Sequence, residues 1–162
     1  MITIQNVNYL TLDDFAGMVH TIQKQKHLFV FLEDIPPFET RYEGVLESIV
    51  EQIKAVCFGV ELYPDLISKA SWLFYALIKN HPFQNGNKRV GVIALVTFLA
   101  LNSTDNENVK TKPEMKNVIY ELALFVAESK AEDKDVVFEE IKSRLSELAC
   151  FMTKKNKWFW II

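Results

Sequence analysis

Apolar residues along most of the chain recur at intervals of three and four positions, which is the spacing of one face of an α-helix. Short polar or proline-containing breaks separate six such segments. The pattern predicts helices over 12–23, 42–58, 64–79, 86–101, 113–129 and 133–150. Helices joined by brief breaks predict an all-α bundle.

Local signals set several of the expected boundaries. Thr11 and Asp14 have the spacing of a capping box at the start of the first helix. Gly59 is expected to end the second helix, and Pro64 suits the first position of the third. Two adjacent prolines make 33–40 a loop or an extended stretch.

The fourth segment differs from the others because it is apolar nearly all round. Residues 90–101 are rich in β-branched side chains, and such a run is also compatible with a buried strand. Its length of 12 residues favours a helix. A helix without a polar face belongs in the interior, so the bundle is expected to have a buried central helix after residue 86.

Composition limits the class of protein without naming a function. The 162 residues are 49% hydrophobic, enough for one domain with a substantial core, which we place at 1–150. The net charge of −3 gives no support for a nucleic-acid binder. Cys57 and Cys150 are distant from each other in sequence and show no metal-binding spacing, so we expect buried, unreactive thiols.

The longest apolar run is too short for a membrane span, which needs about 20 residues. The N-terminus lacks the charged and apolar regions of a secretory signal. These features predict a cytoplasmic protein. The remaining segment, 151–162, is a basic and apolar tail. Packing of this tail on the domain or on a second subunit of a homodimer is favoured over association with a membrane surface.

Chemistry is concentrated in nine residues, HPFQNGNKR, between the third and fourth predicted helices. Gly86 allows close approach of the backbone, and the unpaired N–H groups of the following helical turn form an anion site. Lys88 and Arg89 add two cations suited to phosphate oxygens. His81 is able to take a proton from a hydroxyl near neutral pH. The pattern indicates phosphoryl or nucleotidyl transfer.

Taken alone, each of these residues could also be an ordinary structural or solvent-exposed residue with no role in catalysis or binding. A lysine and an arginine at a helix start are disfavoured by the helix dipole, which argues against a merely solvated face. A structural reading also gives no reason for a histidine, a glycine, asparagines and two cations to occur within nine residues.

The loop resembles the motif of the Fic/Doc family, His-x-Phe-x-(Asp/Glu)-(Gly/Ala)-Asn-(Gly/Lys)-Arg, and is most similar to its death-on-curing (Doc) toxin branch. The resemblance continues in the segments RYEGVLESI and VGVIALVTFLALNS and covers about residues 10–148. It implies that His81 is the general base towards a protein hydroxyl. Gly86 and Asn87 would form the anion hole, Arg89 would hold phosphate, and Phe83 would support the motif.

Lys88 separates the branches of the family. Fic-type AMP-transferases have glycine there and usually an arginine where this chain has Val92. Doc-type members with the lysine are thought to transfer the terminal phosphate of ATP to a threonine of elongation factor Tu. The resemblance therefore implies a kinase-like toxin that uses ATP and Mg²⁺. No self-inhibitory Ser/Thr-x-x-x-Glu-(Gly/Asn) string occurs, so a separate antitoxin chain is expected.

Asn85 is the departure from the motif, because an acid that binds the metal is usual there. An amide oxygen is a weaker ligand for Mg²⁺ than a carboxylate. Two alternatives to the kinase therefore remain open. One is an AMP-transferase with the same pocket, and the other is a catalytically degraded module that binds nucleotide or phosphate.

Overall fold

The computed structural model describes residues 7–25, 33–103 and 113–153. These residues form six α-helices, two short 3₁₀ helices and one small hairpin, which confirms the all-α fold. In chain order the elements are α1 (Leu12–Lys24), η2 (Phe38–Thr40), α2 (Val45–Gln52), β1 (Val56–Cys57), β2 (Val60–Glu61), α3 (Leu66–Lys79), α4 (Asn87–Leu101), α5 (Pro113–Glu128), η3 (Ala131–Asp133) and α6 (Lys134–Thr153).

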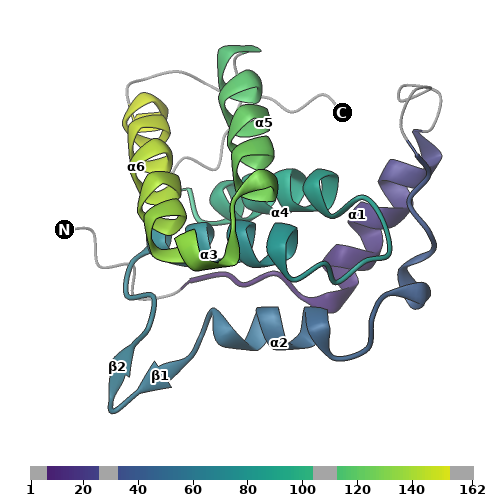
Figure 1. Cartoon of the computed structure of the whole chain (residues 1–162), viewed down its shortest axis with the longest axis horizontal. Helices are drawn as coiled ribbons and strands as arrows, with labels where there is room; N and C mark the ends of the chain where they lie inside the picture. The colour runs from purple at the N-terminus through teal and green to yellow at the C-terminus, as the bar shows by residue number, and fades with distance from the viewer. Residues whose placement is uncertain (1–6, 26–32, 104–112, 154–162) are drawn as a thin grey trace.

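The helices are arranged around a central pair, α3 and α4, which contact each other more than any other two elements do. In the view of Figure 1, α5 and α6 stand side by side across one side of this pair, and α2 lies along the opposite side. Helix α1 packs on α4. The loop that joins α3 to α4 reaches the end of the bundle beside α1 and η2, away from the hairpin (Figure 1).

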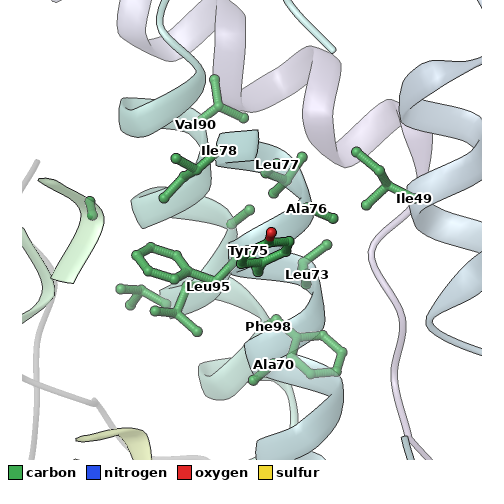
Figure 2. Packing of buried hydrophobic residues seen from close by; sticks show 14 of the residues in the cluster. Ile49, Ala70, Leu73, Tyr75, Ala76, Leu77, Ile78, Val90, Leu95 and Phe98 are labelled. Carbon is green, nitrogen blue, oxygen red and sulfur yellow. The ribbon is translucent and has the colours of Figure 1, made fainter. Parts of the chain in front are cut away.

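Burial is most complete in the two central helices. Every residue of α3 from Ser68 to Ile78 is buried, and α4 buries seven of its residues. Figure 2 shows the packed layer between them, with Leu77 and Ile78 of α3 beside Val90 of α4. The expected central helix is therefore present as α4, but α3, which has apolar residues on all sides over these positions, shares its place.

The start of α1 agrees with the sequence prediction, and α3 begins two residues after its predicted start. The Thr11 hydroxyl accepts from the Asp14 N–H, and the Asp14 carboxylate accepts from the Thr11 N–H at 2.7 Å, which is a complete capping box. In α3 the N-cap is Asp65, paired in the same way with Ser68. Pro64 thus precedes the cap, because the aspartate side chain satisfies the first N–H groups of the helix.

The second helix is much shorter than its apolar spacing predicts. It begins at Val45 and ends at Gln52, and the residues up to 58 that were expected to be helical form a turn and then the hairpin β1–β2. Phe58 and Gly59 form the hairpin turn with φ of 50° and 80°. Gly59 therefore makes a tight reversal between two short strands instead of ending a helix.

The two thiols do not fit the expectation of burial. Cys57 is exposed in β1 because the hairpin projects from the bundle, so the prediction of a buried thiol is wrong for this residue. The Cys150 side chain and the tail 154–162 lie outside the described residues. In the parts of the chain that are described, no helix combines the length and apolarity needed to cross a bilayer.

A buried lysine ties the end of the hairpin to α3. The Lys69 side chain is 3% exposed, and its Nζ donates to Glu61 Oε2 at 2.5 Å and to the Tyr63 carbonyl at 2.6 Å. A buried ammonium that loses its anionic partner is costly, whereas an apolar side chain of similar length is tolerated. The pair thus fixes the entry of the chain into α3.

We expect Glu61→Gln to lower the free energy of unfolding by about 1 kcal/mol, because Lys69 stays buried without a charged partner. Lys69→Met should cost less, since Glu61 is 51% exposed and regains water. Urea denaturation measures both. The control is Glu51→Gln, which breaks the exposed pair with Lys54 and should have almost no effect. A larger loss for Lys69→Met than for Glu61→Gln would contradict the prediction.

Candidate functional site

The loop between α3 and α4 carries the motif residues and is fixed to the segment that precedes α2. The Tyr42 N–H donates to the Pro82 carbonyl at 2.9 Å, and Gln84 Nε2 donates to the Thr40 carbonyl at 3.0 Å. These contacts join positions about forty residues apart in sequence. They hold the loop against η2 at the end of the bundle.

Phe83 anchors the loop through its buried side chain. Its side chain is 3% exposed, and its ring lies 6.2 Å from the ring of Phe38 in η2. The guanidinium of Arg41 lies 4.3 Å from the centre of the Phe38 ring and makes a cation–π contact with it. Phe83 therefore packs the loop against η2.

The segment 41–49 that resembles the family forms one structural unit. Arg41 Nη2 donates to Glu47 Oε1 at 2.5 Å, and this hydrogen bond is the largest cause that lowers the pKa of the Glu47 carboxyl. Gly44 is the N-cap of α2 with φ of 77°, a backbone conformation that favours glycine. The arginine, glycine and glutamate of this segment thus build the corner against which the motif loop packs.

Asn87 holds the loop in shape with its amide. Its Oδ1 accepts from the Phe83 N–H at 2.9 Å, and its Nδ2 donates to the Phe83 carbonyl at 2.8 Å. The residue is buried, so these two backbone groups depend on it for hydrogen bonds. The resemblance implied that Asn87 forms part of an anion hole. Because its side chain is bonded to Phe83, only its backbone N–H, in the first turn of α4, is able to face an anion.

His81 is exposed and lies next to this amide. Its backbone has φ of 47°, in the left-handed region, and its Nδ1 lies 3.4 Å from Asn87 Nδ2. The bonds to Phe83 fix which way the Asn87 amide faces, so it is the amide nitrogen that points to the ring. The amide nitrogen donates to Nδ1 only in the tautomer that carries its proton on Nε2, so the contact favours that tautomer.

The N-terminus of α4 begins directly at the loop. Gly86 is its N-cap with φ of 80°, and the first turn of the helix contains no acidic residue. The N–H groups of a first turn have no partners within the helix and attract anions. Lys88 is exposed in this turn, and Arg89 is half-buried beside it. Lys88 and Arg89 thus lie in the first turn of α4, and His81 lies in the loop that leads into it.

Arg89 is held by a segment from the other side of the loop. Its Nη2 donates to the Glu33 carbonyl at 2.5 Å. Burial lowers the pKa of Arg89, and the charges of Asp34 and Glu33 oppose that effect. The guanidinium is thereby fixed to the segment that precedes η2.

Asn85 contacts the same segment. Its Nδ2 donates to Glu33 Oε2 at 2.7 Å and to the Asp34 carbonyl at 3.4 Å, while its Oδ1 accepts from the Gly86 N–H at 2.6 Å. The described residues contain no group of three or more histidine, cysteine, aspartate or glutamate side chains that could enclose a metal. A site with only a few protein oxygen donors is still compatible with Mg²⁺, because proteins usually bind this ion through one or two carboxylates together with substrate phosphates.

Glu33 is the site residue that sequence reasoning missed. The only signal in the sequence is an acidic pair just before two prolines, in a segment read as a loop. Its contact with Asn85 spans 52 positions, and no local pattern predicts such a pairing.

Comparison with known proteins matches this chain to a family. The Fic/DOC family model matches residues 9–99, which is more than half of the chain and includes the whole loop from His81 to Arg89. The toxin Doc of Mycolicibacterium smegmatis is 39% identical over 64 residues, which are 40% of this chain. The matched part spans 49% of that relative. None of the solved structures matches this chain.

Proposed function

This chain belongs to the Fic/DOC family, and from that premise we propose that it is a Doc-like toxin. It would transfer the terminal phosphate of ATP to a serine or threonine hydroxyl of a protein. One observation carries the proposal: an exposed histidine, in contact with the Asn87 amide, lies in the loop that leads into a helix N-terminus whose first turn bears two cations. The similarity to the toxin Doc of Mycolicibacterium smegmatis supports the branch.

The proposed reaction is an in-line displacement at phosphorus. The hydroxyl oxygen of the target attacks the γ-phosphorus, and its proton passes to the imidazole of His81. The bond from the γ-phosphorus to the bridging oxygen breaks, and ADP leaves with the electron pair. Mg²⁺ would supply positive charge against the phosphate oxygens.

The other motif residues bind and orient the nucleotide. The N–H groups of the first turn of α4, together with Lys88 and Arg89, would hold the phosphates and stabilise the charge that develops on them. Asn87 acts on the reaction by holding both the loop and the imidazole in place. Lys88, where AMP-transferases of the family have glycine, is the reason for preferring transfer of the terminal phosphate over transfer of AMP.

The acceptor and the regulator follow from the same resemblance. We propose elongation factor Tu as the target and a separate antitoxin chain as the inhibitor. Within this proposal the protein acts in the cytoplasm, where both would be found.

The test uses ATP labelled separately at the α- and γ-phosphates, mixed with cell extract and the full chain. We expect protein labelling from the γ-phosphate only, and we expect His81→Ala to reduce its rate at least about 100-fold because the general base is lost. The matched control is His20→Ala, which removes an exposed histidine of α1 and should leave the rate unchanged.

Each other outcome gives a different answer. Label from the α-phosphate means that the chain is an AMP-transferase. Bound nucleotide without His81-dependent label means a phosphate-binding module that no longer catalyses. Circular dichroism of both variants checks that the fold is intact.

A further inference from the structure

A carboxylate from a distant segment lies at the motif position that lacks one. Glu33 Oε2 accepts from Asn85 Nδ2 at 2.7 Å, although the two residues are 52 positions apart. Asn85 is the position at which the sequence has an amide in place of the usual acid. The loop therefore has a negative charge beside it after all, supplied by another part of the chain.

The segment 33–35 is held by three further contacts, which join it to α1, to α4 and to Gly86 at the end of the loop. The Glu33 carbonyl accepts from Arg89, and the Ile35 carbonyl accepts from Gln23 Nε2 of α1 at 3.0 Å. The Ile35 side chain is 3% exposed and packs so closely on Gly86 that a Cβ there would lie 2.4 Å from Ile35 Cγ1. The backbone on both sides of the Glu33 side chain is thus held by neighbouring elements.

We infer that Glu33 is the carboxylate ligand for the divalent cation of the bound nucleotide, and that Asn85 positions it. The inference rests on the proposed function. The Glu33 carboxylate has two oxygens, and the Asn85 amide donates only to Oε2. This hydrogen bond leaves Oε1, and one electron pair of Oε2, for a cation. One carboxylate together with nucleotide phosphates is a usual ligand set for Mg²⁺.

The arrangement also gives a reason for the amide at position 85. An aspartate there would place two carboxylates at hydrogen-bond distance, and like charges at that separation repel each other. An asparagine donates a hydrogen bond to Glu33 and so fixes its orientation. The pair has one negative charge in total, the same as a motif with an acid at position 85 and no glutamate beside it.

The test measures binding of a non-hydrolysable ATP analogue to the full chain by calorimetry, once with EDTA and once with excess Mn²⁺. The ratio of the two affinities reports how far the protein binds the metal in the complex. We expect Glu33→Gln to reduce this ratio about tenfold, a typical loss at metal sites, without weakening the affinity in EDTA. The matched control is Glu39→Gln, an exposed glutamate of η2, which should keep the wild-type ratio.

A double variant moves the charge back to the motif. Glu33→Gln combined with Asn85→Asp should regain most of the lost ratio, because the carboxylate then stands on the other side of the same contact. A wild-type ratio in Glu33→Gln overturns the inference and leaves the proposed function intact, and a double variant as weak as Glu33→Gln also overturns it. Failure of the wild-type chain to bind the analogue in both conditions overturns the proposed function itself.

Discussion

Replacement of Gly86 by alanine is expected to destabilise the fold by about 2–5 kcal/mol and to weaken nucleotide binding. Gly86 has φ of 80°, and this left-handed conformation costs about 1–2 kcal/mol for a residue with a Cβ. The new Cβ would also lie 2.4 and 2.5 Å from Cγ1 and Cδ1 of Ile35. Relief of such overpacking in a core costs about 1–3 kcal/mol.

Two other glycines separate these contributions. Gly44 has φ of 77° but open space around the position of a Cβ, so Gly44→Ala should show the conformational cost alone, about 1–2 kcal/mol. Gly17 lies inside α1 with open space, so Gly17→Ala should stabilise the protein by about 0.5–1 kcal/mol.

Urea denaturation followed by circular dichroism measures all three glycine variants. The expected order of stability is Gly17→Ala above wild type, then Gly44→Ala, then Gly86→Ala. Equal losses for Gly86→Ala and Gly44→Ala would mean that the contact with Ile35 is not tight. Weaker binding of the ATP analogue by Gly86→Ala alone would tie the contact to the site.

Removal of the Asn87 amide is expected to reduce both stability and transfer. Asn87→Ala leaves the buried Phe83 N–H and carbonyl without their partners, which costs about 1–3 kcal/mol. It also removes the group that fixes the ring of His81. The rate of label transfer should therefore fall even under conditions in which the variant is fully folded.

The comparison with Asn117→Ala shows whether the effect is specific. Asn117 is an exposed amide of α5, and its loss should change stability by no more than about 0.5 kcal/mol. Asn87→Asp keeps the acceptor for the Phe83 N–H but sets an oxygen against the Phe83 carbonyl, so it too should be less stable than wild type. An Asn87→Ala protein as stable as Asn117→Ala would contradict the assigned role.

Features encoded by neighbouring residues could be predicted from the sequence. The capping box of Thr11 and Asp14 and the near-complete extent of α1, α3, α4, α5 and α6 follow from spacing over a few positions. The second helix could not be predicted in this way. Its apolar spacing continues beyond Gln52, but the chain leaves the helix for a hairpin whose strands are stabilised by pairing with each other and by the Lys69 contacts. Helical periodicity gives no sign of these contacts, although they join positions only a few residues apart.

For the site, sequence by itself determined which residues stand together. His81, Gly86, Asn87, Lys88 and Arg89 lie within nine positions at a helix start, and that proximity is a property of the chain. The tertiary structure decided what each side chain contacts. It directs the Asn87 amide to Phe83, binds Arg89 to the Glu33 carbonyl and places the Glu33 carboxylate beside Asn85. The physical reason is that hydrogen bonds and charges act over a few ångströms of space, and only the packing of α1, η2 and α4 brings residues 33 and 85 within that range.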